Sequence, residues 1–347
     1  MSMKKDRREM HKMKKFLTLT TGGTIASKES EHGLLPALGG DELLSYIPDI
    51  EGLCTVDTLE ICNIDSTNMN YSYWCKLVSC IQENYDRYDG FLIAHGTDTL
   101  AYTAAAMSYM IQNSKKPVIL TGAQKPISFE STDAMMNLRD SFHYMLQDDT
   151  NGVQVVFGQR AIAGTRAKKI NTLSYQAFSS INFPDIAVIR NSQVIRYITA
   201  PRGGNAVFEL NLNPKVFLLK LTPCSSPELI EEIYRLYDVI IIEGFGVGGI
   251  PDQLLDTFCK CQNSYKPQEK VLVITTQVMS EGSHISVYEV GKRLEGKIRY
   301  LEAKDMNLEA VVTKSMWIMG KKPASWEEIE TLFYRTINYD ILAGSGR

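Results

Sequence analysis

Short hydrophobic runs alternate with longer amphipathic segments from Phe16 to about residue 157. The short runs are rich in β-branched residues and predict buried strands, whereas the longer segments have apolar residues every three or four positions and predict helices. The expected strands are 16–20, 55–61, 90–94, 118–121 and 153–157, and the expected helices are 71–86, 99–113 and 132–147. This alternation indicates a parallel sheet covered by helices on both faces.

A second series of the same kind occupies the last third of the chain. Its expected strands are 216–221, 239–242 and 271–275, and its expected helices are 307–319 and 325–337. The stretch between the two series contains Pro, Gly and Asn with little periodicity, which is typical of a linker. The sequence therefore predicts an α/β protein with a parallel-sheet amino-terminal domain (16–195), a linker (196–214) and a smaller α/β carboxy-terminal domain (215–347).

Charge and cysteine content narrow the class of protein. The net charge is −3, too small to predict a nucleic-acid or membrane-surface partner. Residues 1–15 hold seven Lys or Arg and only two Asp or Glu, so we expect a disordered basic tail. No apolar run approaches the length of a membrane span. The seven cysteines form no CxxC pair, which favours a reducing cytoplasm and gives no support to a metal site.

Hydroxyl side chains follow the first and third expected strands. The first strand leads into T-G-G-T (21–24), where two glycines permit a sharp turn and Thr24 presents a hydroxyl. The third leads into H-G-T-D-T (95–99), where Thr97 adds a second hydroxyl and Asp98 a carboxylate. A tight turn or a helix cap explains either motif alone. Ligands bind beyond the carboxyl ends of parallel strands, so the two together indicate a site.

Two further polar groups fall near the same edge. The second strand leads to Asp65 and Ser66, which suit a substrate ammonium and a substrate carboxylate respectively. After the fifth strand come Lys168 and Lys169, either of which is an ordinary surface charge when considered alone. A threonine hydroxyl is a weak nucleophile and needs a neighbouring group that takes its proton. An ammonium beside Asp98 is a candidate for that group.

These motifs resemble those of the bacterial-type L-asparaginases, and of their cytoplasmic type I branch in particular. The residues that carry the resemblance are TGGTIAS (21–27), NIDST (63–67), HGTDT (95–99), TGAQKP (121–126) and R-x-x-K (166–169). It continues into the second series through EGFGVGGIP (243–251), TTQ (275–277) and DMNLEAVVTK (305–314). Only the basic tail lies outside it.

The resemblance implies a mechanism. Thr24 is expected to attack the side-chain amide carbon of L-asparagine and form an acyl-enzyme, which yields L-aspartate and ammonia. Thr97, Asp98 and Lys169 are expected to form a second catalytic group that handles the water. The residues expected to bind the substrate, including the backbone that stabilises the oxyanion, are Asp65, Ser66, Thr67, Gly96 and Ala123. No cofactor or metal is implied, L-glutamine is expected as a weaker substrate, and the assembly is expected to be a homodimer or homotetramer.

The chain also departs from the family pattern. Many members carry a lid tyrosine after the first motif, where this chain has Leu34, so Tyr288 or Tyr300 is a candidate replacement. Some type I members are activated by asparagine at a second site. This chain differs at three positions of that site, which predicts weak or absent activation; they are Lys168, Phe245 and Val278. Gly249 replaces a common Asn, a difference that bears on substrate choice.

Three alternative functions compete with asparaginase activity. The run GFGVGG (244–249) has the spacing of a dinucleotide fingerprint, but the next strand ends in Thr and Gln where an acidic residue is required. The amidase subunit of a tRNA-dependent amidotransferase shares these motifs, but it normally has an extra amino-terminal domain that 15 residues cannot supply. The third is a protein that binds an amino acid without catalysis. The complete set of catalytic residues argues against this function, whereas the absence of the lid tyrosine at Leu34 is consistent with it.

Overall fold

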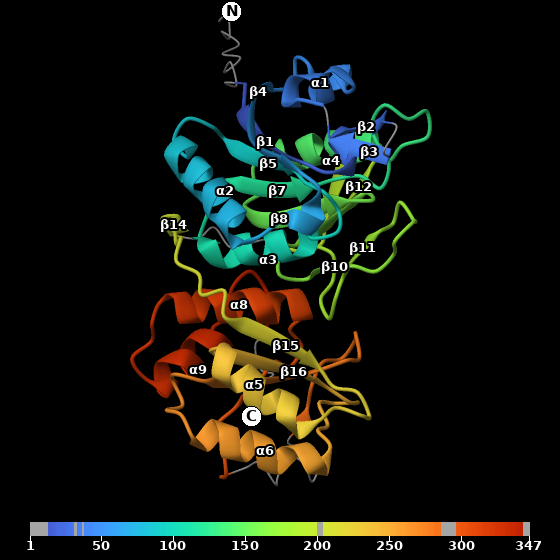
Figure 1. Ribbon diagram of the computed structural model, residues 1–347. Helices are drawn as coiled ribbons and strands as arrows, with labels where there is room; N and C mark the ends of the chain where they lie inside the picture. Colours follow the sequence, from blue (N-terminus) through green and yellow to red (C-terminus); the bar gives the residue numbers. More distant parts are fainter. Residues whose placement is uncertain (1–12, 31–32, 37, 200–203, 286–295, 343–347) are drawn as a thin grey trace, which may run out of the picture.

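The computed structural model describes residues 13–30, 33–36, 38–199, 204–285 and 296–342. Its two α/β units lie one above the other, the amino-terminal unit at the top of Figure 1. An eight-stranded sheet forms the core of the first unit and a four-stranded sheet that of the second. The predicted α/β class, with a larger and a smaller unit, is therefore confirmed. Residues 1–12 of the expected tail and Tyr288 lie outside the described residues.

The five strands predicted for the amino-terminal unit all occur in the large sheet, next to one another. The sheet order is β13-β12-β9-β8-β7-β5-β1-β4. Five neighbouring strands run parallel, and they are β4 (Thr55–Ile64), β1 (Lys15–Gly22), β5 (Gly90–Ala94), β7 (Pro117–Thr121) and β8 (Gly152–Phe157). Their carboxyl ends consequently meet along one edge.

Three antiparallel strands extend this sheet beyond β8, which the sequence pattern did not predict. They are β9 (Arg160–Ala163), β12 (Ala187–Arg190) and β13 (Gln193–Arg196). The β8–β9 turn has positive φ at Gly158 (56°) and Gln159 (66°), and the β12–β13 turn has positive φ at Asn191 (49°) and Ser192 (64°). Two consecutive positive φ angles define the tight turn that joins antiparallel neighbours. The sheet is thus mixed, with five parallel strands that end at the β4 edge and three antiparallel strands at the other edge.

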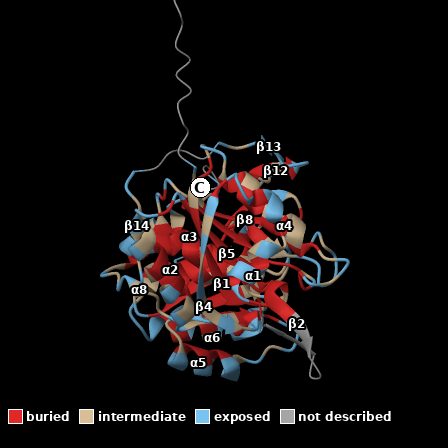
Figure 2. Cartoon of the chain, turned by 90° about the horizontal axis from the view of Figure 1, so that it is seen from above, coloured by how far each residue is buried: buried red, intermediate tan, exposed pale blue. Residues whose placement is uncertain are grey.

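Helices cover both faces of the large sheet. On one face, Leu17 and Leu19 of β1 share a buried cluster with α2 (Tyr71–Asn84) and α3 (Leu100–Met110). On the other face, Phe16 packs in a second cluster with α1 (Gly40–Ser45) and α4 (Ala134–Met145). This alternation follows from the two-residue period of a strand. Seen from above, the buried strands lie inside a rim of exposed residues (Figure 2).

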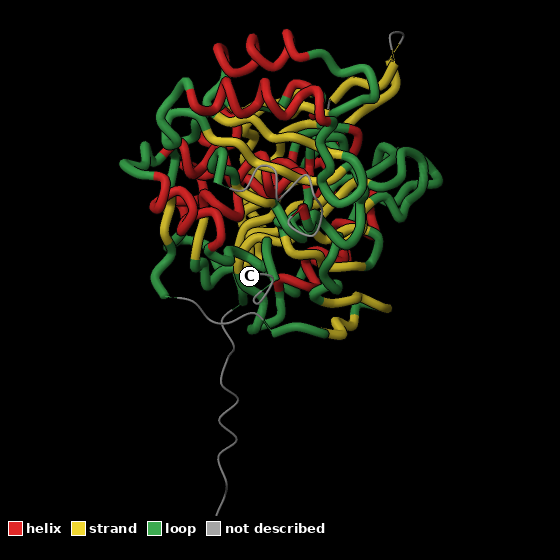
Figure 3. Tube along the Cα trace, turned by 90° about the horizontal axis from the view of Figure 1, so that it is seen from below, coloured by secondary structure: helices red, strands yellow, loops and turns green. Residues whose placement is uncertain are grey.

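The small sheet is built in the same way. It consists of four parallel strands, β15 (Val216–Lys220), β16 (Val239–Gly244), β17 (Val271–Thr276) and β18 (Leu301–Glu302). Along β16, Val239 and Ile241 pack with α8 (Leu308–Gly320) and α9 (Trp326–Tyr334), whereas Ile240 and Ile242 pack with α5 (Pro227–Leu236) and α6 (Asp252–Asn263). The strands therefore lie between two helical layers, as the view from below shows (Figure 3).

Helix α3 forms the junction between the units. All of its residues except Tyr102 are buried, because the sheet covers one side and α8 covers the other (Figure 1). Tyr109 stacks on Trp317 with ring centroids 6.0 Å apart. The expected linker also contributes, since β14 (Val207–Phe208) pairs with β6 (Ile111–Gln112) directly after α3. The domain boundaries themselves stay a prediction.

Shorter elements complete the described part of the chain. They are η1 (Thr24–Ala26), β2 (Ser27–Ser30), β3 (Gly33–Pro36), η2 (Pro48–Ile50), η3 (Ser66–Asn68), β10 (Ala167–Lys169) and β11 (Phe178–Ser180). None of the helices within the described ranges is long and apolar enough to cross a membrane.

Candidate active site

The loops that follow β1, β4, β5 and β7 touch one another at the carboxyl edge of the large sheet. A Cβ atom on Gly23 would lie 2.4 Å from the Cα of Gly96, and a Cβ on Gly96 would lie 2.6 Å from the Cβ of Ser66. A Cβ on Gly122 would lie 2.3 Å from the carbonyl oxygen of His95. Only glycine fits at these distances. The four expected motifs therefore meet at one place.

The glycine turn after β1 places Thr24. Gly22 and Gly23 have φ angles of 90° and 78°, which a residue with a side chain rarely adopts. The N–H of Gly23 donates to the Ile64 carbonyl at 3.0 Å, and the Ser27 hydroxyl donates to the Gly23 carbonyl at 2.9 Å. Thr24 is the first residue of η1 and is partly exposed. Its hydroxyl is thus carried by a turn that is fixed to β4.

Lys169 connects Thr97 and Asp98 of the third motif. Its Nζ donates to the Thr97 hydroxyl at 2.8 Å and to the Asp98 carboxylate at 2.6 Å. Thr97 is buried, whereas the Lys169 side chain is 18% exposed and that of Asp98 is 55% exposed. The group is therefore reached from solvent on the Asp98 side. Lys169 lies in β10, which pairs with β11 and does not belong to the parallel strands.

The second motif is built from short-range hydrogen bonds. One carboxylate oxygen of Asp65 accepts from the backbone N–H of Thr67 at 2.8 Å and from its hydroxyl at 2.9 Å, and so caps η3. The buried Ser66 hydroxyl accepts from the N–H of Asp98 at 3.3 Å, and the Thr99 hydroxyl donates to the Ser66 carbonyl at 2.7 Å. These bonds fix the second motif against the third.

His95 is a residue to which the motifs assigned no role. It is fully buried, and burial lowers its pKa to about 4, so the imidazole is neutral near pH 7. The Gly96 carbonyl can only accept, so Nδ1 carries the hydrogen and donates to it at 2.7 Å. Nε2 then accepts from the Thr103 hydroxyl at 2.9 Å, and this hydroxyl accepts from Trp74 Nε1 at 2.9 Å. The sequence signal is a histidine directly after the apolar strand β5, which indicates burial but does not identify Thr103 as its partner.

Gln124 is a second residue that the sequence motifs did not single out. Its side-chain oxygen accepts from the Thr97 hydroxyl at 3.2 Å, and its side-chain nitrogen donates to the Thr172 carbonyl at 2.9 Å. Its backbone N–H donates to both carboxylate oxygens of Asp133 at 3.0 Å. Burial raises the pKa of Asp133, and the hydrogen bonds that it accepts oppose this effect. Ala123, the expected oxyanion residue, is fully buried beside Gln124.

Of the two candidate replacements for the lid tyrosine, Tyr300 lies among the described residues and Tyr288 does not. At Leu34 the structure describes the backbone, which pairs with Glu29 in the β2–β3 hairpin. Tyr300 packs against the apolar cluster that lies beneath α5 and α6 in the carboxy-terminal unit. Among the residues that the structure describes, no group of three or more His, Cys, Asp or Glu could hold a metal ion.

The loop at 244–249 closes on itself. The N–H of Phe245 donates to the Gly249 carbonyl at 2.9 Å, and the N–H groups of Gly248 and Gly249 donate to the Phe245 carbonyl at 2.9 and 2.6 Å. A phosphate-binding loop must direct its amides at the ligand. The internal bonds of this loop are therefore a further argument against a dinucleotide.

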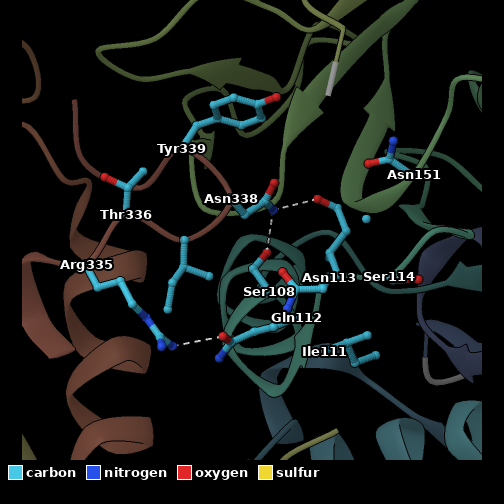
Figure 4. Close-up of a pocket in the computed structure, with 13 residues that line it drawn as sticks. Ser108, Ile111, Gln112, Asn113, Ser114, Asn151, Arg335, Thr336, Asn338 and Tyr339 are labelled. Atoms are coloured by element: carbon cyan, nitrogen blue, oxygen red, sulfur yellow. Dashed lines mark hydrogen bonds between the residues drawn. The ribbon is translucent and has the colours of Figure 1, made fainter. Parts of the chain in front are cut away.

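Two of the cavities in the described part of the chain bear on the location of the site. A cavity of about 410 Å³ opens between the end of α3, residues 151–153 and residues 335–339, near the opposite ends of the strands (Figure 4). It contains none of the expected site residues. A cavity of about 250 Å³ lies between the two units and is lined by Lys168 and Val278, two of the three positions at which the chain departs from the activated members.

Comparison with known proteins assigns the class. Residues 15–202 match the family model described as "Asparaginase, N-terminal", and residues 215–333 match the "Glutaminase/Asparaginase C-terminal domain". The chain therefore belongs to the asparaginase family, and the resemblance carried by its motifs is confirmed. The prediction that the chain is an enzyme of this family is confirmed with it.

Individual relatives agree with this class. An L-asparaginase of Thermococcus kodakarensis is 39% identical, with 94% of this chain and 99% of that protein aligned. The solved structure of the thermostable L-asparaginase from that organism matches at a TM-score of 0.88, with 38% identity, 95% of this chain and 99% of that one. L-asparaginase I of Vibrio cholerae matches at a TM-score of 0.84 with 26% identity, over 96% of this chain and all of that one.

A relative with another name is also similar over most of the chain. It is a glutamyl-tRNA(Gln) amidotransferase component from Methanosphaera stadtmanae, which is 34% identical over 91% of this chain, but over only 74% of its own length. That relative is consequently longer than the region that the two proteins share.

Proposed function

We propose that the protein hydrolyses L-asparagine to L-aspartate and ammonia. The observation that carries the proposal is the position of the Lys169 ammonium, which bonds both Thr97 and Asp98 beside the turn that bears Thr24. Two threonine hydroxyls, a carboxylate and an ammonium at one strand edge form a set that can activate a hydroxyl nucleophile and a water in succession.

In the proposed reaction, the Thr24 hydroxyl oxygen attacks the side-chain amide carbon of the substrate. The C–N bond breaks, the hydroxyl proton is transferred to the leaving nitrogen, and ammonia departs from an aspartyl ester of Thr24. Water then attacks the ester carbon, which releases L-aspartate and restores the hydroxyl. We assign Thr97, Asp98 and Lys169 to the orientation and activation of this water, because the ammonium holds the Thr97 hydroxyl at 2.8 Å.

Substrate binding is assigned to the second motif and the adjacent backbone. We infer that Asp65 accepts from the α-ammonium group of the substrate and that Ser66 and Thr67 bond its α-carboxylate. Gly96, the Thr97 amide and the Ala123 backbone are assigned to the amide oxygen, which becomes an oxyanion during attack. The close contact between Gly96 and Ser66 supports a compact site that suits a small amino acid.

Ammonia release tests the assignment directly. Wild type is expected to release ammonia from asparagine and, more slowly, from glutamine. Thr24→Ala and Thr97→Ala should each reduce release by about three orders of magnitude or more, because each removes a group that acts on the reacting atoms. Thr331→Ala, on the exposed face of α9, is the control and should match wild type. Undiminished release by both active-site variants would refute the assignment.

A second candidate is the amidase of a tRNA-dependent amidotransferase, which the similarity to the Methanosphaera stadtmanae protein favours. This function predicts faster ammonia release from glutamine than from asparagine, and stimulation by a partner that carries charged tRNA. An idle binding protein would instead bind asparagine by calorimetry and release no ammonia. The same assay therefore separates all three.

We also propose that the protein is a cytoplasmic homo-oligomer. Ile170 and Leu173, in the loop between Lys169 and β11, are 42% and 88% exposed, and a second copy of the chain would cover this apolar surface. Sedimentation velocity should give a dimer or tetramer mass, and a monomer at micromolar concentration would contradict this part of the proposal.

A further inference from the structure

Arg166 is a buried cation at the junction of the two units. Its guanidinium is fully shielded from solvent and donates through Nη2 to the Asp305 carboxylate at 2.6 Å and through Nη1 to the Asp305 carbonyl at 2.7 Å. Its Nε donates to the Tyr339 carbonyl at 2.5 Å. A buried guanidinium needs such acceptors to offset its lost hydration. Arg166 therefore ties the amino-terminal unit to two separate segments of the carboxy-terminal unit.

The two residues that follow Arg166 are held by the same part of the carboxy-terminal unit. The Ala167 carbonyl accepts from the Asn307 side chain at 3.0 Å. The Lys168 ammonium donates to the Glu309 carboxylate at 2.9 Å. With the Arg166 bonds, three consecutive residues at β10 are bonded to residues 305–309, which we call the junction segment.

The junction segment is anchored on its other side as well. Asn182 donates to the Asp305 carbonyl at 3.0 Å. Asn338 donates to the Ser108 hydroxyl and to the Val153 carbonyl, both at 2.8 Å, and so fixes the carboxy-terminal segment that supplies the second acceptor of Arg166 (Figure 4). The contacts of Arg166 are therefore made to parts of the fold that are themselves restrained.

The alternation of side chains along a strand then determines where Lys169 points. Successive side chains of an extended strand point to opposite faces. Lys168 points to α8, so Lys169 points away from it, and its ammonium reaches Thr97 and Asp98. A shift of the junction segment would move the backbone of β10 and, with it, the Lys169 ammonium.

We propose that Arg166 and Asn307 are positioning residues, which act through β10 to place the Lys169 ammonium against Thr97. The inference rests on the proposed function, in which Lys169 serves the water-activating group. It makes the carboxy-terminal unit responsible for the geometry of the active site in its own chain. A displacement of about 1 Å at a reacting group can lower a rate roughly a hundredfold.

The principal test variant is Asn307→Ser. Asn307 also accepts from the N–H of Ala310 at 2.9 Å and so caps α8. Serine keeps a capping oxygen, but its side chain is too short to reach the Ala167 carbonyl. We expect kcat for ammonia release to fall roughly 10- to 100-fold while KM changes less than about twofold. Arg166→Lys, which keeps the charge and loses the paired bonds, should act in the same direction.

Glu209→Gln is the matched control at the same junction. Glu209 accepts from Trp317 Nε1 at 2.8 Å and pairs with Lys321, but it does not contact β10. Its kcat should equal that of wild type. A loss of kcat in Glu209→Gln as large as in Asn307→Ser would mean that the junction affects activity generally, and would overturn the proposal.

A double-mutant cycle with Lys169→Ala separates positioning from general stability. If Asn307 acts through the ammonium, Asn307→Ser has no further effect on the residual kcat of Lys169→Ala. A further tenfold loss in the double variant would overturn the proposal.

The crystal structure of Asn307→Ser gives a readout that does not depend on activity. We expect the Lys169 Nζ to lie beyond hydrogen-bonding distance, about 3.5 Å, of the Thr97 hydroxyl. An Nζ that still bonds Thr97 in the variant would overturn the positioning proposal even if asparagine is hydrolysed. Absence of ammonia release by wild type would instead refute the proposed function.

Discussion

The imidazole Nε2 of His95 accepts a hydrogen bond from the Thr103 hydroxyl at 2.9 Å, at the start of the loop that carries Thr97. Because Nδ1 donates at the same time to Gly96, both ring nitrogens are used by the neutral form. Protonation would place an N–H at Nε2 against a hydroxyl that donates to the neutral ring and already accepts from Trp74 Nε1, so the Thr103 hydroxyl would have to turn its hydrogen away. The hydrogen bonds at His95 are therefore those of the uncharged imidazole.

A pH dependence of stability follows. Burial lowers the pKa of His95 to about 4, below its ordinary value, so the unfolded chain binds a proton that the folded chain does not between about pH 6.5 and pH 4. Stability should fall as the pH is lowered through this window, by up to about 3 kcal/mol at its lower end. Urea unfolding of wild type and His95→Gln measures the effect. Parallel curves of stability against pH for the two proteins would contradict the prediction.

Asp140 should have the opposite dependence. It is 5% exposed, and one of its carboxylate oxygens has no hydrogen-bond partner among the described residues. Burial raises its pKa to about 6, so the folded chain holds the proton more tightly than the unfolded chain does. The free energy of unfolding should then decrease as the pH rises from about 4 to about 6, by up to about 3 kcal/mol.

Asp140→Asn removes this penalty. The variant should be more stable than wild type at pH 7.5 and gain little at pH 4, as measured by thermal or urea unfolding at both values. Asp86→Asn, at an exposed position after α2, is the control and should show no such difference. An equal gain for Asp140→Asn at both pH values would point to packing and not to charge.

Activation of the enzyme by asparagine at a second site should be weak or absent. Lys168 stands where activated members have Thr, and its ammonium is held by Glu309 at 2.9 Å in the wall of the cavity of about 250 Å³ between the units. The Lys168 ammonium and the Glu309 carboxylate already neutralise each other in this pair, so neither charge is available to an amino acid that binds there. The rate should therefore rise hyperbolically with asparagine concentration, and a sigmoidal curve would refute the prediction.

The strand-end chemistry was predictable because parallel strands share an edge. Thr24, Ser66 and Thr97 follow three different strands, and their loops meet because β4, β1 and β5 are neighbours in the sheet. The sequence predicted that Lys169 follows the fifth strand, but not the path of the chain between them. Lys169 follows an antiparallel hairpin whose turn holds Gln159 at a positive φ, and nothing in that residue type signals such a conformation.

Contacts between distant segments could not be predicted from the sequence pattern. Arg166 and Asp305 are 139 residues apart, and a single buried ion pair leaves no periodic trace in either segment. His95 looks like any residue at the end of a strand until Thr103, one helix turn into α3, is placed against it. Periodicity reports which face of an element is buried, but not which polar side chains pair across it.

Gln124 gives the most direct test of the group around Thr97. Its side-chain oxygen accepts from the Thr97 hydroxyl at 3.2 Å and so fixes the direction of the hydroxyl hydrogen. The Thr97 oxygen then has a lone pair free to accept from the Lys169 ammonium at 2.8 Å. Gln124→Ala should lower kcat roughly tenfold or more, because the hydroxyl loses a fixed orientation. Gln124→Glu retains an acceptor and should lose less. Gln147→Ala, just after α4, is the control, since among the described residues its side chain bonds only the His143 carbonyl. A Gln124→Ala variant with the kcat of wild type would show that the Thr97 hydroxyl is oriented by Lys169 alone.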